Sequence, residues 1–220
     1  MLCIVGMLIQ TAFMYSEYKK KMTAALFLKG LASAVFVCVG FCGKITAENT
    51  RFANMVVVGL LLGAAGDVLL NIRYLVKKNS QPVFMAGIAA FFAGHVMYLA
   101  AQLPYCEHIG IAAAAGAAVA GVLIAVMFKH TVAEPAFKAF GGVYVMTVVL
   151  MASVSIGSLF AAQNPCRVLF ACGAFFFLVS DSILIFNTFG PKFSFPLGAL
   201  TLVLYYIGQS LIALSVYYPV

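Results

Sequence analysis

Long apolar runs constrain the fold of this chain more than any other feature of its sequence. A helix needs about 20 apolar residues to cross the ~30 Å hydrocarbon core of a bilayer. The chain divides at its charged and proline-containing stretches into eight runs near that length, of which the first is short. They are approximately Met1–Tyr15, Met22–Cys42, Phe52–Ile72, Val83–Leu103, Ile109–Phe128, Ala136–Ala162, Val168–Thr188 and Leu197–Tyr218.

These runs indicate an integral membrane protein. Only 9% of the residues are charged and 65% are hydrophobic, whereas an ordinary soluble domain has about 25% charged residues. A membrane barrel would need alternating strands of about ten residues, which the sequence lacks. We therefore predict an all-α, polytopic membrane bundle with about eight transmembrane helices. The loops between runs are short, so residues 1–220 are expected to form a single transmembrane domain.

The prolines and the basic residues both support this division. Six of the seven prolines fall between runs and the seventh, Pro219, is near the C-terminus, as expected because proline disrupts a helix interior. Nine basic residues follow odd-numbered runs and three follow even-numbered ones. The positive-inside rule then places both termini on the non-cytoplasmic side of the membrane, which we expect to be a bacterial cytoplasmic membrane. The nine are Lys19, Lys20, Lys21, Arg73, Lys77, Lys78, Lys129, Lys138 and Lys192, and the three are Lys44, Arg51 and Arg167.

The net charge of +7 arises largely from this loop bias. No basic stripe with interleaved aromatic residues is present, so membrane lipids are expected partners and nucleic acid is not. The six cysteines form no CxxC pair. They therefore predict neither a zinc site nor a disulfide framework.

The two halves of the chain resemble each other, which suggests a duplicated four-helix unit with repeats over residues 1–105 and 106–220. Asp67 lies in the third run and Asp181 in the seventh; Lys29 precedes the first by 38 residues and Tyr144 precedes the second by 37. An even number of spans per unit would give both halves the same orientation in the membrane. The fourth and eighth runs each carry tyrosine and glutamine at i, i+4, namely Tyr98 with Gln102 and Tyr205 with Gln209.

The two aspartates, which are the only ones in the chain, both lie inside apolar runs. A charged aspartate at the centre of a membrane helix costs about 2.5–3.5 kcal/mol on insertion scales. An ion pair with Lys29 would compensate one of them, unless the lysine instead extends toward the headgroups. No second interior cation is evident for the other. We therefore predict a functional role for the pair, in a polar pocket that both carboxylates share.

The order of the polar motifs resembles the YhhN-like lysoplasmalogenase family. A lysine occurs early in the second run, "GD" closes the third, "FFAGHVMYLAAQ" lies in the fourth, "SDS" in the seventh and "YYIGQSLIA" in the eighth. The similarity extends from about Leu26 to Leu214, with one departure: Gly30 stands where the family often has proline. The resemblance implies hydrolysis of the vinyl ether bond of a lysophospholipid substrate, a lysoplasmalogen, to a fatty aldehyde and a glycerophospho-base. The polar site that it implies is Lys29, Asp67, His95, Tyr98, Asp181, Tyr205 and Gln209.

Vinyl ether hydrolysis begins with protonation of the β-carbon, which gives an oxocarbenium-like cation. Such chemistry suits one protonated and one ionised carboxylic acid, as in glycosidases. We predict that Asp67 and Asp181 are catalytic and divide these roles, and that Lys29 or Arg73 holds the phosphate. The predicted substrate-binding residues are Lys29, Asn71, His95, Tyr98, Tyr144, Tyr205 and Gln209.

Other interpretations of the same residues remain open. Asn71 could simply satisfy a helix end, and Asp67, Asp181 and His95 could hold a metal, although we expect neither a metal nor another cofactor. Repeated halves with acidic residues also fit a small-molecule or proton-coupled transporter. A lipid-binding scaffold without activity is a third possibility.

Overall fold

The computed structural model describes residues 2–76, 78, 80–132 and 134–220. Met1 and Lys77, which entered the predictions of the first run and of the charge bias, lie outside the described residues. Within the described ranges the protein contains eight α-helices, one short 3-10 helix and no strand. The helices are α1 (Leu2–Tyr18), α2 (Met22–Thr46), α3 (Thr50–Ile72), α4 (Ser80–Gln102), α5 (Ile109–His130), α6 (Pro135–Ser158), α7 (Pro165–Phe189) and α8 (Phe195–Ser215), with η1 (Leu103–Tyr105) after α4.

Seven of these helices, α2 to α8, are long and apolar enough to cross a membrane. The first helix, α1, has 17 residues, which gives it a length of about 25 Å, and it packs along α2. The predicted all-α membrane bundle is therefore confirmed. The short first run corresponds to α1, the shortest of the eight α-helices.

Prolines and asparagines set where several helices begin. Pro135 and Pro165 are the first residues of α6 and α7, where the missing N–H of proline is not needed by the helix. Asn49 and Asn164 cap α3 and α7, since each side chain accepts a hydrogen bond from a backbone N–H in the first turn. Prolines thus mark the helix borders, as the sequence predicts, although the helices extend a few residues beyond the apolar runs to reach them.

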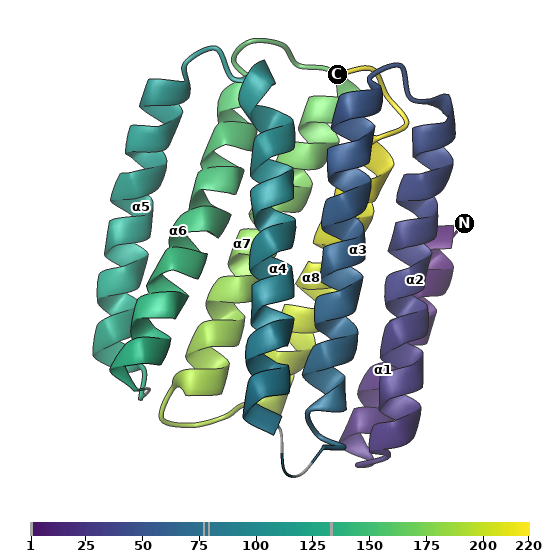
Figure 1. Ribbon diagram of the computed structural model, residues 1–220, viewed down its shortest axis with the longest axis vertical. Helices are drawn as coiled ribbons and strands as arrows, with labels where there is room; N and C mark the ends of the chain where they lie inside the picture. The colour runs from purple at the N-terminus through teal and green to yellow at the C-terminus, as the bar shows by residue number, and fades with distance from the viewer. Residues whose placement is uncertain (1, 77, 79, 133) are drawn as a thin grey trace.

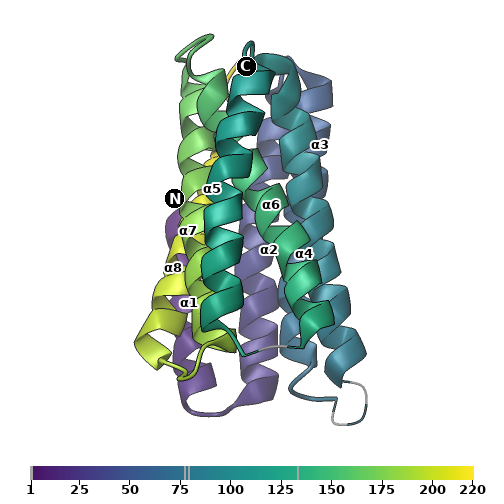
Figure 2. The same ribbon diagram turned by 90° about the vertical axis from the view of Figure 1, so that its left-hand side faces the viewer.

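The helices run roughly along the long axis of the molecule, and successive helices alternate in direction (Figure 1 and Figure 2). The connections α1–α2, α3–α4, α5–α6 and α7–α8 all lie at one end of the bundle, which is the lower end in Figure 1. The described residues among the nine basic ones that follow odd-numbered runs therefore gather at this end. Which side of the membrane this end faces stays a prediction.

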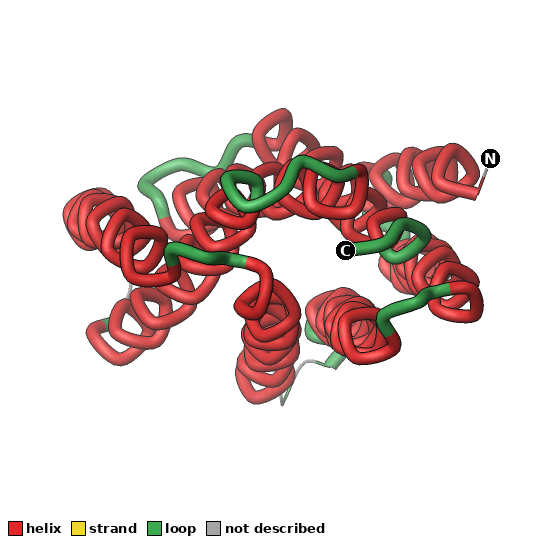
Figure 3. Tube along the Cα trace, turned by 90° about the horizontal axis from the view of Figure 1, so that it is seen from above, coloured by secondary structure: helices red, strands yellow, loops and turns green. Residues whose placement is uncertain are grey.

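Two helix pairs form the centre of the bundle. The most extensive contacts join α3 to α4 and α7 to α8, followed by α1 with α2 and α5 with α6, while α4 also packs on α6 and α8 on α2. Seen along the helix axes in Figure 3, the N-terminal helix lies at the periphery of this cluster. The large apolar core extends over α2, α3, α4, α6, α7 and α8.

Glycines allow the two central pairs to cross closely and in the same register. A Cβ on Gly94 would lie 3.1 Å from the carbonyl oxygen of Gly59, and a Cβ on Gly208 would lie 2.9 Å from that of Gly173. Gly59 and Gly173 each lie eight residues before Asp67 and Asp181, respectively. The two pairs therefore cross at equivalent positions relative to the aspartates. A duplicated unit predicts this geometry, and the duplication itself stays a prediction.

Candidate functional site

Asp67 is enclosed in the bundle and its charge is compensated. Its side chain is 3% exposed, and Lys29 Nζ lies 3.1 Å from its Oδ1. Ser33 and Tyr205 both donate hydrogen bonds to its Oδ2, at 2.5 and 2.8 Å. One cation and two hydroxyl donors thus surround this carboxylate. A buried ion pair of this kind is stable only when such additional hydrogen bonds satisfy the remaining oxygen atoms.

Lys29 does not extend toward the headgroups. Its ammonium lies 5.0, 5.3 and 5.1 Å from the ring centres of Phe13, Tyr205 and Tyr206, and the residue is 5% exposed. The hydroxyl of Tyr206 also lies 3.1 Å from Ser33 Oγ. The lysine is therefore an interior counter-ion held by aromatic faces.

A chain of hydrogen bonds extends from Asp67 to α4. Tyr205 receives a hydrogen bond of 3.3 Å from Gln209 Nε2, and Gln209 Oε1 accepts one of 2.7 Å from Tyr98. The predicted residues Lys29, Asp67, Tyr98, Tyr205 and Gln209 thus belong to one connected group that links α2, α3, α4 and α8.

Two further residues of α3 bear on this group. A Cβ on Gly63 would lie 2.6 Å from Gln209 Nε2, so the glycine provides the space that the glutamine occupies. Asn71 Nδ2 donates to the backbone oxygen of Asp67 at 3.1 Å. This bond holds the Asn71 amide on the backbone of its own helix, and Asn71 does not line the cavity.

Asp181 lies in a second, smaller polar group. Tyr144 on α6 donates a hydrogen bond of 2.7 Å to its Oδ2, and His95 Nε2 on α4 lies 3.8 Å from the same oxygen. Both contacts are on Oδ2. Neither supplies a permanent positive charge, since a histidine is charged only when protonated.

The contacts of His95 indicate which of its ring nitrogens is free. Nδ1 lies 2.7 Å from the carbonyl oxygen of Phe91, so we assign the proton to Nδ1, which donates to that oxygen. Nε2 is then an unprotonated acceptor, and it is buried without a hydrogen-bond partner among the described residues. The ring of Phe177, with its centre 4.4 Å from that of His95, packs edge-on against the imidazole.

The register of the glycine crossings corrects one predicted equivalence. Gly94 and Gly208 are 114 residues apart, as are Asp67 and Asp181, whereas Tyr98 and Tyr205 are 107 apart. The two tyrosine and glutamine pairs therefore lie seven residues, or about 10 Å along a helix, out of register. Their expected equivalence is wrong. A spacing of i, i+4 recurs easily on any helix and does not define depth.

By the same register, His95 corresponds to Gln209, and Phe91 corresponds to Tyr205. The surroundings of Asp181 therefore include a phenyl ring, Phe91, where those of Asp67 include the hydroxyl of Tyr205. They also include Tyr144 where those of Asp67 include Lys29. These two differences remove a cation and a hydroxyl donor, so Asp181 is less completely surrounded than Asp67.

An apolar cavity of about 120 Å³ lies against Asp181. It extends between α3, α4, α6 and α7 from Arg73 and Phe84 near the helix ends to Tyr144 and Asp181, about 10 Å deeper along the helices. Its polar lining is limited to Arg73, Tyr144, Asp181 and Thr188 among mostly aliphatic and aromatic residues. The other lining residues are Leu70, Phe84, Ile88, Phe91, Phe137, Phe140, Gly141, Leu184, Ile185 and Phe189.

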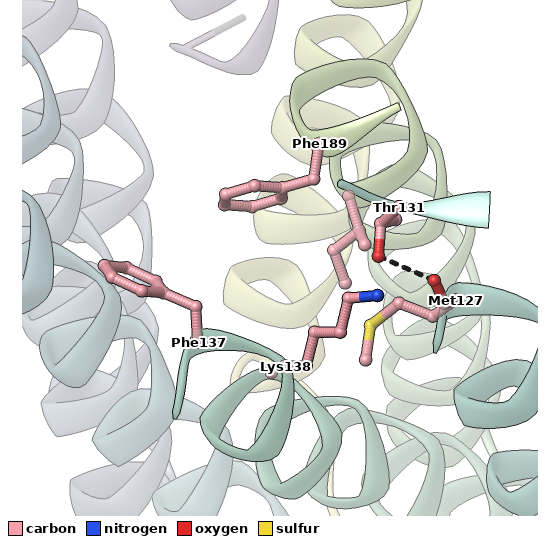
Figure 4. Close-up of a pocket in the computed structure, with 7 residues that line it drawn as sticks. Met127, Thr131, Phe137, Lys138 and Phe189 are labelled. Atoms are coloured by element: carbon pink, nitrogen blue, oxygen red, sulfur yellow. Dashed lines mark hydrogen bonds between the residues drawn. The ribbon is translucent and has the colours of Figure 1, made fainter. Parts of the chain in front are cut away.

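A smaller hollow of about 40 Å³ adjoins this cavity between α5, α6 and α7 and shares four lining residues with it. Figure 4 shows Phe137 and Phe189 on its walls, with the Lys138 side chain extending toward Met127 and Thr131. The ammonium of Lys138 donates a hydrogen bond of 2.9 Å to the backbone oxygen of Phe128. The shared residues are Phe137, Gly141, Ile185 and Phe189.

The expectation of one pocket shared by both carboxylates is wrong. Asp181 lines the cavity and Asp67 does not, because α3 turns the Asp67 side chain toward α2 and α8. Among the predicted substrate-binding residues, Tyr144 lines the cavity, and His95 lies behind the lining, against Asp181, Tyr144 and Phe91. The metal set of Asp67, Asp181 and His95 is not assembled either, since no three His, Cys, Asp or Glu in the described part of the chain are placed to hold a metal.

Sequence reasoning missed several residues of both groups. Ser33, which binds Asp67, lies four residues after Lys29 and so on the same helix face. The α7 residues that line the cavity could also have been predicted from the sequence. They follow Asp181 at i+3, i+4, i+7 and i+8, which places them on the same face of the helix. They are Leu184, Ile185, Thr188 and Phe189.

Comparison with known protein families gives one match. The model of the YhhN family matches residues 18–216, which is most of the chain. The curated proteins and the solved structures contain no match to the chain.

Proposed function

The chain belongs to the YhhN family, and from this premise we propose that it is a membrane-embedded hydrolase that cleaves the vinyl ether bond of lysoplasmalogens. The products would be a fatty aldehyde and a glycerophospho-base. The observation that carries the proposal is the position of Asp181 at the inner part of an apolar cavity. Tyr144 donates a hydroxyl hydrogen bond to it, and no lysine or arginine among the described residues lies within 4.0 Å of it.

Asp181 is suited to be the general acid. Burial without a cation favours the neutral form of a carboxylic acid, and Asp181 is 6% exposed. A protonated Asp181 can transfer its proton to the β-carbon of a vinyl ether in the cavity. The C=C bond then supplies the electron pair for the new C–H bond, and an oxocarbenium ion forms beside the carboxylate that remains. That carboxylate stabilises the cation, as in glycosidases.

His95 is suited to accept the proton of the attacking water. With Nδ1–H donating to Phe91, Nε2 presents a lone pair toward Asp181. Water adds to the oxocarbenium carbon and gives a proton to His95 Nε2. The product of this addition is a hemiacetal. As the C–O bond to glycerol breaks, the imidazolium protonates the glycerol oxygen and the hemiacetal hydroxyl returns its proton to Asp181. Both groups end in their initial states.

The sequence predicted that Asp67 is catalytic in a pocket shared with Asp181; we propose instead that its role is indirect. Paired with Lys29, it holds α2, α3 and α8 together. Phe91 and Phe177, which contact Tyr205 of this group, also lie against His95. The Asp67 group therefore supports the walls of the Asp181 site from behind.

The critical experiment measures aldehyde release from lysoplasmenylcholine by the purified protein in detergent or lipid. Asp181→Asn should lower the rate about 10²–10⁴-fold, the usual contribution of a general acid, while the protein remains folded. Near-normal cleavage by a folded Asp181→Asn protein would refute the acid role. Absence of aldehyde from the wild-type protein would refute the proposed function.

The transporter interpretation is less well supported. Substrate sites of many transporters are formed by interrupted helices, whereas α3 and α7, which carry the two aspartates, are continuous over Thr50–Ile72 and Pro165–Phe189. Flux of a lysolipid into proteoliposomes without aldehyde formation would favour the transporter over the hydrolase.

A further inference from the structure

Arg73 is placed at the end of the cavity that lies nearest the helix ends. It follows the last residue of α3 and lines the same cavity as Asp181. Asp67 lies six residues earlier on α3, which is about 9 Å along the helix axis, and Asp181 occupies the equivalent depth by the glycine register. The cavity therefore has a cation near its outer end and a carboxylic acid deeper inside.

The guanidinium of Arg73 is held in place by aromatic rings. It lies 4.5 Å from the ring centre of Phe84 and 4.6 Å from that of Tyr74, and its Nη2 donates a hydrogen bond of 2.6 Å to the Tyr74 hydroxyl. These contacts fix the group without neutralising it. Fixed, stacked guanidinium groups are well suited to bind phosphate.

The charge of Arg73 is also not taken up by an ion pair. Throughout the described ranges, no carboxylate lies within 4.0 Å of it, and its Nε is buried without a hydrogen-bond partner. Lys29, a second cation inside the bundle, is bound to Asp67 and does not line the cavity. The sequence predicted that either Lys29 or Arg73 binds the phosphate, and of these two only Arg73 lines the cavity.

We propose that Arg73 binds the phosphate of a lysophospholipid and so determines that the substrate is a lysolipid with a phosphate in its headgroup and its reactive bond next to Asp181. The inference rests on the proposed function for the identity of the lipid. In a lysoplasmalogen only the glycerol backbone separates the phosphate from the vinyl ether. A phosphate at Arg73 would therefore place the vinyl ether deeper in the cavity, toward Tyr144 and Asp181.

A non-cleavable ligand tests this site apart from catalysis. Binding of a saturated 1-O-alkyl lysophosphatidylcholine is compared with binding of the matching 1-O-alkylglycerol, which has the same chain but no phosphate. Arg73→Gln should weaken binding of the phospholipid about 10- to 100-fold, as expected for a lost charge-assisted hydrogen bond, and leave the alkylglycerol unchanged. Arg73→Lys should lose an intermediate amount, because lysine keeps the charge but not the fork of donors.

Lys192→Gln is the matched control. Lys192 is an exposed cation in the α7–α8 connection, at the same end of the bundle, and it does not line the cavity. This variant should bind both ligands as the wild-type protein does. An equal loss for the control would show that only the general surface charge matters, and it would overturn the proposal.

Competition identifies the source of the phosphate. Glycerophosphocholine and inorganic phosphate should compete only weakly, because neither fills the apolar cavity; competition by inorganic phosphate as strong as that by the lysolipid would overturn the lipid assignment. Unchanged phospholipid binding in Arg73→Gln, or an equal loss for both ligands, would overturn the role of Arg73. If the wild-type protein releases no aldehyde but binds the alkyl lysolipid in an Arg73-dependent way, the proposed hydrolysis fails and the phosphate site stands.

Discussion

Tyr144 donates a hydrogen bond of 2.7 Å to Asp181, at the place where the other half of the bundle has Lys29 against Asp67. The two aspartates lie at equivalent depths, yet one has a cation as its neighbour and the other has a phenol. A cation stabilises the ionised carboxylate, whereas a phenol in an apolar site permits the neutral acid. This difference separates a structural ion pair from a candidate proton donor.

The two aspartates should respond differently to the same substitution. Asp181→Asn should abolish most aldehyde release with little change in thermal stability, because no buried charge loses its partner. Asp67→Asn should lower the free energy of unfolding by about 3–5 kcal/mol, since it leaves the buried Lys29 ammonium unpaired. Thermal unfolding in detergent, measured beside the aldehyde assay, checks both. Equal stability losses in the two variants would contradict the assignment.

Removing both members of the ion pair should cost less than removing one. Lys29→Met and Asp67→Asn each leave a buried charge, while the double variant leaves none. We expect the double variant to unfold at a higher temperature than either single variant, with a coupling free energy of about 0.5–3 kcal/mol or more. Additive losses in this double-mutant cycle would mean that the two side chains do not depend on each other.

The hydroxyl of Tyr144 should affect catalysis more than folding. Tyr144→Phe keeps the ring but removes the donor to Asp181, and we expect kcat to fall about 10-fold, in proportion to one lost hydrogen bond. Tyr206→Phe is the control, since the Tyr206 hydroxyl lies 3.1 Å from Ser33 in the Asp67 group and does not line the cavity. If both variants lose activity equally, the hydrogen bond from Tyr144 to Asp181 has no specific role in the reaction.

The glycine crossing of α7 and α8 should tolerate no side chain. A Cβ on Gly173 would lie 2.8 Å from the backbone oxygen of Gly208, so Gly173→Ala should destabilise the protein by about 1–3 kcal/mol through overpacking. Gly121 on α5 has nothing within 4 Å of such a Cβ, and Gly121→Ala should be neutral or stabilise by up to about 1 kcal/mol. Comparing the unfolding temperatures of the two variants tests whether the crossing is as close as the structure indicates.

The sequence alone predicted the helices and the polar residues that lie between them. Hydrocarbon cannot satisfy backbone hydrogen bonds, so apolar runs of this length must become helices, and the prolines mark where they begin. The cost of a buried carboxylate likewise pointed to Asp67 and Asp181 before any contact was known. Both conclusions depend on the local composition of the chain, which the sequence gives in full, and on the general properties of a lipid bilayer.

The tertiary structure decided which polar residues meet. A helix face is fixed by spacing, but the neighbour that it faces depends on how deeply two helices cross, and the glycine crossings set that depth. For this reason Tyr98 reaches Gln209 and not the second aspartate, and Asp67 turns toward Lys29 while Asp181 turns toward a cavity. Residues far apart in the chain build each site, so only their packing separates the ion pair from the candidate acid.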